Sequence, residues 1–336
     1  MTERLVSLVT TVDDSVTGGH LYNRHMSDQA PRHRVRLELI PIGDLARAQG
    51  LIVVDSLVAS AMPTSLRSNL GRLAALVHQV PGGVDGSRES RRARRSADLA
   101  LYQRCDLVIA ASPYLGEALV KAGIAEDRVV VVVPGCDLQI SETSAGDMRL
   151  GRRLALVNVA NWLPNKGILE LLDAIEPIPS EEVVLHLVGS LAADPHYAAA
   201  VQDRLRSPAL SGKVMVHGVV TPEEMGGLYA GADSLVLTSH DEGYATVVAE
   251  ALRAGLPVLA WSVGNIPNLL TDGEEGILLP RGDLERLRDS IRRLAGDGAL
   301  RSEMASKASI RGSALPTWEQ SGDLFFATLD RLLPPV

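Results

Sequence analysis

Short apolar runs of strand length recur along the whole chain, and segments of helical period separate them. Six runs lie in the first half, at residues 5–12, 34–41, 51–55, 73–79, 107–112 and 129–135, and six in the second, at 154–160, 183–190, 213–218, 234–239, 257–261 and 276–280. The runs are continuous in Val and Leu, which is typical of strands that are covered on both faces. Their alternation with helices predicts right-handed parallel βαβ units.

A polar segment divides this pattern into two halves. "DLQISETSAGDMRLGRR" (137–153) contains Gly and Ser and has no strong period, so we interpret it as a linker. A chain of 336 residues is comfortable for two domains of ordinary size. We therefore predict two doubly wound α/β domains. Ligands of such sheets bind beyond the C-terminal ends of the strands, and we expect those two edges to face one cleft.

Composition excludes several classes of protein. The formal net charge of −8 argues against general nucleic-acid binding, which usually needs a positive face. Cys105 and Cys136 form no disulfide framework and are not spaced as metal ligands. No apolar run reaches the roughly 20 residues of a membrane helix, and the N-terminus lacks the layout of a signal peptide, so we expect a reduced, cytoplasmic protein. The sequence has no Asp-x-Asp pair, Walker loop or serine nucleophile elbow, and we expect no metal.

The segment "SHDEGYATVVAE" carries the most informative pattern. The apolar run ends at Ser239 and a helical period continues to Gly255, so Glu242 lies in the turn before a helix and Glu250 about two turns inside it. The amides of Gly243, Tyr244, Ala245 and Thr246, with the helix dipole, suit a phosphate.

A glutamate beside a phosphate should repel it unless the carboxylate binds something else. Glu242 and Glu250 make sense if they accept hydrogen bonds from hydroxyls that flank a diphosphate, a sugar on one side and a ribose on the other. That is the shape of a nucleotide sugar. In the alternative interpretation Glu242 is only an acid at a helix start, and Glu250 pairs with Arg253 at i,i+3.

Basic and glycine residues add candidates. Lysine occurs at only four positions, and Lys166 follows the run 154–160 at the start of a helix, where an ammonium could neutralise a diphosphate. The alternative is an exposed lysine near a proline turn. Gly18 and Gly19 permit close approach of a phosphate or sugar, although a Gly pair more often marks a turn. Five arginines between Arg88 and Arg95 read as a solvated helix face, or as a surface for a phosphorylated acceptor or an anionic membrane.

Together these segments resemble the retaining GT-B glycosyltransferases of family 4, the group 1 type. Glu242-x7-Glu250 with Gly243, followed by "EALRAGLPVLAWSVGNIPNLLTDGEEGILL", resembles the donor-site signature. "VTGGHLYNRHM" (16–26) resembles the first Gly-rich loop, "LVHQ" (76–79) the histidine strand, "ANWLPNKGILELLDAI" (160–175) the phosphate loop and "PTWEQSGDLFFATLDRLL" (316–333) the final helix. The resemblance implies a GT-B architecture with two Rossmann-like domains: an acceptor-side domain at 1–140, a donor-binding domain at 151–316, and a C-terminal helix, 317–333, that crosses back to the first.

The resemblance also implies roles for single residues. His78 would lie at the transferred sugar, Glu242 would hold a sugar hydroxyl, and Glu250 the ribose. Lys166 would stabilise the diphosphate, and the backbone near Val219 and Val220 would meet the base. Gly18 and Gly19 would contact the donor, and the acceptor would enter near them and His78. Asn161 would also bind the donor, at a position where the family usually has an arginine.

The implied activity is metal-independent, retaining transfer of a hexose-type sugar (EC 2.4) from a UDP-, GDP- or similar nucleotide sugar to an acceptor hydroxyl or amine in carbohydrate biosynthesis. A front-face mechanism, in which the leaving phosphate takes the acceptor proton, needs no separate base. The acceptor would be a small molecule, a glycan or a lipid-linked group, and Arg88–Arg95 would allow peripheral membrane contact. The alternatives are an epimerase or phosphorylase on the same fold, a catalytically weak sugar-nucleotide-binding protein, or inverting transfer with His20 as base.

Overall fold

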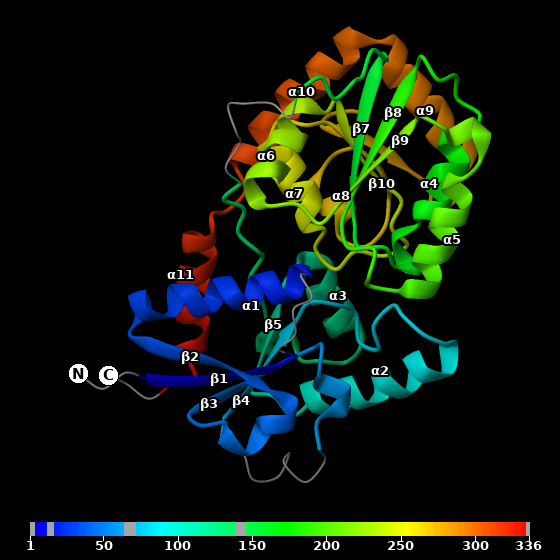
Figure 1. Ribbon diagram of the computed structural model, residues 1–336. Coiled ribbons are helices and arrows are strands. Elements are labelled where there is room, and N and C mark those ends of the chain that lie inside the picture. Colours follow the sequence, from blue (N-terminus) through cyan, green and yellow to red (C-terminus); the bar gives the residue numbers. More distant parts are fainter. Residues whose placement is uncertain (1–3, 12–16, 64–71, 139–145, 334–336) are drawn as a thin grey trace. The chain divides into compact units, whose positions relative to one another are not determined.

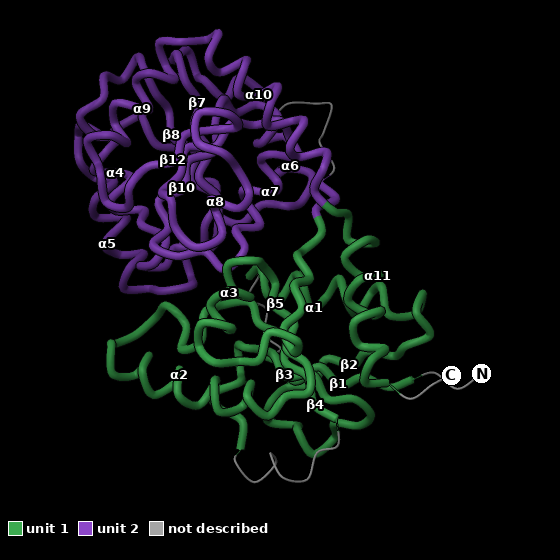
Figure 2. The backbone as a smooth tube through the Cα atoms, turned by 180° about the vertical axis from the view of Figure 1, so that it is seen from behind, with its two compact units in different colours: residues 1–135, 316–336 green, residues 136–315 purple. Residues whose placement is uncertain are grey.

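The computed structural model describes residues 4–11, 17–63, 72–138 and 146–333 (Figure 1). These ranges leave out part of the predicted linker and the ends of the predicted first domain. They also leave out Val12, at the end of the predicted first strand, and Val16, at the start of the predicted Gly-rich loop. The chain divides into two compact units, shown in different colours in Figure 2. Unit 1 contains residues 1–135 and 316–336, and unit 2 contains residues 136–315.

Unit 1 is built on a six-stranded parallel sheet, sheet A, in the order β2-β1-β3-β4-β5-β6. Its strands are β1 (Arg4–Thr10), β2 (Val35–Pro41), β3 (Leu51–Asp55), β4 (Leu73–Val77), β5 (Leu107–Ala110) and β6 (Val129–Val131), and its helices are α1 (Gly18–Gln29), α2 (Arg88–Tyr102), α3 (Pro113–Lys121) and α11 (Trp318–Leu329). Successive strand residues point to opposite faces, so each strand contributes to two cores. One core includes side chains of α1 and α11, and the other includes side chains of α2 and α3.

The C-terminal helix belongs to unit 1, as the predicted crossing requires. α11 lies beside α1 (Figure 1), and Trp318 and Phe325 place their rings edge-on to Tyr22, with centroids 5.8 and 6.2 Å away. A Cβ atom at Gly135 would lie 2.2 Å from the backbone nitrogen of Trp318, so only glycine allows the chain to pass so close to the start of α11.

Unit 2 contains a second six-stranded parallel sheet, sheet B, in the order β12-β11-β10-β7-β8-β9. Its strands are β7 (Leu154–Val159), β8 (Val183–Val188), β9 (Val214–Gly218), β10 (Ser234–Leu237), β11 (Val258–Trp261) and β12 (Gly276–Leu279), and its helices are α4 (Ile168–Ile175), α5 (Pro195–Leu205), α6 (Pro222–Gly231), α7 (Thr246–Arg253), α8 (Ile266–Leu269), α9 (Leu284–Gly296) and α10 (Gly298–Ser313). α4 packs on α9 and α5, and α7 packs on α10. Short 3₁₀ turns complete the two units: Ala30–His33, Ile42–Arg47, Ala59–Ala61, Glu126–Arg128, Pro164–Lys166 and Pro208–Leu210.

Every predicted apolar run forms a strand, and both sheets are parallel, so the predicted fold class is confirmed. Several strands, including β4 and β10, end earlier than their predicted runs, which leaves His78 and Ser239 in the loops that follow. In the described part of the chain, every helix is too short or too polar to span a lipid bilayer.

Candidate functional site

The turn between β10 and α7 forms the centre of the candidate site on unit 2. Ala245 has a left-handed backbone (φ 71°) and provides no side-chain cap for α7. Asn265 fixes this turn, since its backbone amide donates to the carbonyl oxygen of Glu242 (2.9 Å) and its Nδ2 to that of Tyr244 (3.2 Å). Within the described residues, the amides of Ala245 and Thr246 have no acceptor. The start of α7 is therefore open to an anion.

Lys166 and Glu242 meet across this edge of sheet B. The Lys166 Nζ lies 2.6 Å from Glu242 Oε1, and the two side chains are 23% and 12% exposed. Lys166 ends the 3₁₀ turn Pro164–Lys166, and this loop is tied to the end of β10: Thr238 Oγ1 donates to the carbonyl oxygen of Gly167 at 2.8 Å, and the His240 amide to that of Asn165 at 2.7 Å. Two residues that were assigned separate roles from the sequence thus form one ion pair.

Glu250 is held by a tyrosine of a neighbouring helix. The Tyr229 hydroxyl, on α6, donates to Glu250 Oε2 at 2.9 Å. Burial raises the pKa of the Glu250 carboxyl to about 7, and the hydrogen bond from Tyr229 partly opposes this rise. Arg253 instead donates to the carbonyl oxygens of Cys136 (2.7 Å) and Leu315 (3.1 Å), so the alternative ion pair between Glu250 and Arg253 is wrong.

His240 belongs to the same edge through a partner that the sequence did not indicate. Its Nε2 lies 2.9 Å from Glu170 Oε1 in the first turn of α4, and its ring stacks on Trp261 with centroids 5.9 Å apart. An Arg281 guanidinium nitrogen lies 3.4 Å from the His240 carbonyl oxygen. The only sequence signal for Glu170 was its position in the first turn of the helix that follows the predicted phosphate loop.

The remaining predicted residues of unit 2 lie in the adjoining loops. Asn161 Oδ1 accepts a hydrogen bond from the Ser190 amide at 3.0 Å, which joins the loops after β7 and β8. Val219 and Val220 follow β9 and precede Thr221, the residue that caps α6. Val219 is 72% exposed.

The predicted residues of unit 1 gather at the C-terminal edge of sheet A. Gly18 and Gly19 open α1, and a Cβ atom at Gly19 would lie 3.1 Å from the His78 ring, so glycine admits this ring. Burial lowers the pKa of His78, although the nearby Asp55 charge raises it in part. The two ring nitrogens of His20 lie 2.6 and 2.7 Å from the hydroxyls of Thr11 and Thr17. His20 is therefore already engaged at both nitrogens.

Asp55, at the end of β3, escaped the sequence analysis. Its carboxylate is fully buried and accepts hydrogen bonds from Thr10 Oγ1 (2.7 Å), Asn23 Nδ2 (2.6 Å) and the Leu57 amide (2.9 Å). One Asp at the end of "LIVVD" looks like an ordinary strand end, so no pattern singled it out. Within the described ranges, no group of three or more His, Cys, Asp or Glu side chains is arranged to hold a metal ion.

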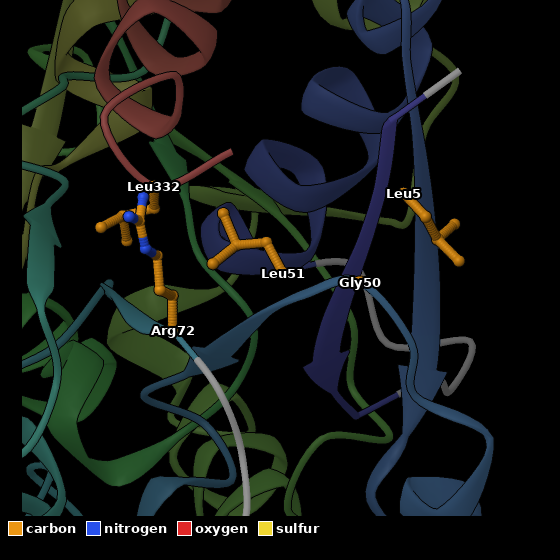
Figure 3. Close-up of a pocket in the computed structure, with 5 residues that line it drawn as sticks. All are labelled: Leu5, Gly50, Leu51, Arg72 and Leu332. Carbon is orange, nitrogen blue, oxygen red and sulfur yellow. The ribbon is translucent and has the colours of Figure 1, made fainter. Parts of the chain in front are cut away.

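A cavity of about 240 Å³ lies at the opposite edge of sheet A (Figure 3). Leu5, Gly50, Leu51, Arg72 and Leu332 line it. They lie at or beside the starts of β1, β3 and β4, whereas His78 and Asp55 lie at the strand ends. The cavity is therefore separate from the predicted site residues.

Comparisons with known proteins show which sequences and folds this chain resembles. Residues 153–297 match a family described as glycosyl transferases group 1. A D-inositol 3-phosphate glycosyltransferase of Corynebacterium diphtheriae is 26% identical over 71% of this chain and 59% of its own length, and one of Thermomonospora curvata is 30% identical over 63% of this chain and 52% of its own length. The chain thus spans between half and three fifths of the length of these relatives.

Solved structures share the whole fold. The Anabaena protein HepE in complex with UDP and glucose is 20% identical, with a TM-score of 0.79, over 98% of this chain and all of that one. Sucrose-phosphate synthase from Thermosynechococcus elongatus is 19% identical, with a TM-score of 0.83, over 98% of this chain and 99% of that one. This chain therefore has the two parallel α/β units of the GT-B fold, and over most of unit 2 its sequence is similar to the group 1 glycosyltransferases.

Proposed function

We propose that this chain is a retaining glycosyltransferase that binds a nucleotide diphosphate sugar at the C-terminal edge of sheet B and transfers the sugar to an acceptor hydroxyl or amine. The observation that carries the proposal is the ion pair between Lys166 and Glu242, which lies in the turn that leads to the open start of α7. The family match and the UDP-glucose complex of the similar protein HepE support it, and they make uracil the first base to test.

The diphosphate binds where positive charge is concentrated. The amides of Ala245 and Thr246 and the Lys166 ammonium supply this charge, and hydrogen bonds from a charged donor are stronger than those between neutral groups. Glu242 accepts a hydroxyl of the transferred sugar through the carboxylate oxygen that Lys166 leaves open. Glu242 holds the Lys166 ammonium in place in the free protein, so the donor binds a positive charge that is already partly buried and positioned.

Glu250 and the loop after β9 bind the nucleoside. The Glu250 carboxylate accepts hydrogen bonds from the ribose hydroxyls. The Tyr229 hydroxyl holds this carboxylate in place by donating to Oε2. The backbone at Val219 and Val220 meets the edge of the base, and the exposed Val219 side chain covers its face.

The chemistry follows from charge that develops on the leaving group. As the bond between the sugar and the diphosphate breaks, Lys166 and the α7 amides stabilise the new negative charge, which is usually the largest electrostatic task of such a reaction. The acceptor oxygen or nitrogen bonds to the anomeric carbon on the face from which the phosphate leaves, and the leaving phosphate takes its proton. Configuration is therefore retained, and no separate base or metal takes part. Unit 1 binds the acceptor near Gly18, Gly19 and His78. Product stereochemistry by NMR and turnover in EDTA test these two features.

A thermal-shift panel of nucleoside diphosphates and their sugars tests donor binding. A ligand that binds the folded form raises the melting temperature, so the base and sugar that bind are identified together. Lys166→Ala and Glu250→Ala should lose the shift and sharply reduce transfer. Lys307→Ala, which replaces a partly exposed, ion-paired lysine of unit 2, is the matched control and should keep both. Unchanged turnover in both site variants refutes the site.

One observation favours a second candidate, a sugar-nucleotide-binding protein with weak catalysis. Asn161 gives its side-chain oxygen to the Ser190 amide and carries no charge, whereas the family usually has an arginine there. Strong donor binding without transfer to any acceptor, with transfer gained in Asn161→Arg, identifies this second function.

A further inference from the structure

A buried chain of hydrogen bonds connects Asp55 to His78 in unit 1. Asp55 Oδ2 accepts from Asn23 Nδ2 at 2.6 Å, and Asn23 Oδ1 lies 3.1 Å from His78 Nε2. Asn23 is 1% exposed and the His78 side chain 7% exposed. Asp55 and His78 follow one another along the edge, at the ends of β3 and β4, and Asn23 reaches them from α1.

The chemistry of Asp55 fixes the orientation of the Asn23 amide. A carboxylate only accepts hydrogen bonds, so the Asn23 atom at 2.6 Å from it must be the NH₂ group. Thr10 agrees with this assignment: its hydroxyl donates to Asp55 Oδ2 at 2.7 Å, and its oxygen accepts from Asn23 Nδ2 at 3.2 Å. A flipped amide would bring two acceptor oxygens together. Asn23 Oδ1 therefore faces His78.

The orientation of Asn23 then decides the tautomer of His78. An amide oxygen only accepts, so His78 Nε2 must carry a proton and donate it to Asn23. Burial lowers the pKa of His78, which keeps the ring neutral at pH 7 and leaves Nδ1 without a proton. Among the described residues, Nδ1 of His78 has no hydrogen-bond partner. This atom is not fully buried, so a ligand can reach it.

The ring is also fixed in position. The edge of Tyr22 contacts it at a centroid distance of 5.1 Å, Gly19 leaves room for its Cδ2 side, and the His78 amide donates to Ser56 Oγ at 3.0 Å. A neutral imidazole with an open Nδ1 lone pair therefore stands at the edge of sheet A, where parallel sheets bind ligands.

We propose that Asn23, anchored by Asp55, is a positioning residue that holds His78 as the Nε2–H tautomer, so that Nδ1 accepts a hydrogen bond from a substrate hydroxyl at this edge. The identity of the substrate rests on the proposed glycosyl transfer, whereas the tautomer does not. In the Nδ1–H tautomer His78 would donate a hydrogen bond to the substrate hydroxyl and could not accept one from it at Nδ1.

¹⁵N NMR of the imidazole rings tests the tautomer in the unmodified protein. The chain has eight histidines, and the His78 signals are assigned by their loss in His78→Gln. At pH 7 we expect a protonated Nε2 and an unprotonated Nδ1, and in Asn23→Leu, which keeps the volume but removes the amide, a mixture of both tautomers. A proton on Nδ1 in the unmodified protein, or an unchanged spectrum in Asn23→Leu, overturns the proposal.

A double-mutant cycle tests the functional consequence. Asn23→Leu should lower kcat for transfer about tenfold, the fold-change expected for one misplaced hydrogen bond, with the melting shift by the nucleotide sugar unchanged. In the His78→Ala background, Asn23→Leu should have no further effect on kcat. Additive losses would mean that Asn23 acts independently of His78 and would overturn the positioning role. The expected tautomer in a protein that binds no nucleotide sugar would instead refute the proposed function.

Discussion

Replacing Glu250 by glutamine isolates the electrostatic cost of burying this carboxyl. In the folded protein its pKa is about 7, compared with an ordinary value of 4.5. Between these two values the folded state binds more protons than the unfolded state, so the free energy of unfolding of unit 2 should decrease as pH rises through this window and stay low above it. One unit of pKa shift corresponds to about 1.4 kcal/mol, so the raised pKa of Glu250 should lower the free energy of unfolding by about 3 kcal/mol at high pH. About 2.5 kcal/mol of this loss should occur between pH 5 and pH 8.

The three tryptophans of the chain allow unit 2 to be observed by itself. Trp162 and Trp261 lie in unit 2 and Trp318 in unit 1, so the fluorescence of a Trp318→Phe background reports only on unit 2. Urea unfolding of this background, with and without Glu250→Gln, is measured at pH 5 and pH 8. From pH 5 to pH 8, the free energy of unfolding of the Trp318→Phe background should fall by about 2.5 kcal/mol more than that of the same protein with Glu250→Gln. All other titrating groups are common to both proteins and cancel in the difference.

The reasoning is refuted if both proteins show the same change with pH. A difference of the opposite sign, with the Glu250 protein gaining stability as pH rises, would mean that the carboxyl is held as a stabilised anion. Either result would remove the assignment of Glu250 as a desolvated acceptor.

Three further predictions use the same geometry. Tyr229→Phe removes the bond that lowers the pKa of Glu250, so in the same fluorescence assay the loss of stability should extend to higher pH. Lys166→Ala should weaken nucleotide-sugar binding, measured by calorimetry, about ten- to hundredfold, whereas Lys307→Ala should not; equal losses would show a general effect of charge. Phe325→Ala should cost unit 1 about 3–5 kcal/mol, followed by Trp318 fluorescence, because the ring is fully buried; a loss below about 1 kcal/mol would contradict the packing of α11.

The strands could be predicted because their Val and Leu runs are continuous and alternate with helical segments. Few folds other than a parallel sheet covered by helices on both faces match this pattern. Lys166 and Glu242 could be predicted singly, since each follows such a run. Their mutual ion pair could not, because 76 positions separate them and loop packing alone brings them together. Asp55 and Tyr229 were missed for the same reason: each looks ordinary in its own segment, and only its partner gives it a role.

The division of unit 1 into two stretches of sequence has a consequence for how the protein is made. The ribosome completes all of unit 2 at residue 315, before it has produced the helix that covers Tyr22 and Met26. Until residues 316–333 emerge, the first part of unit 1 has an uncovered apolar face, while the complete unit 2 is already present on the same chain. We expect this interval, rather than the folding of either sheet, to be the moment at which the protein depends most on chaperones.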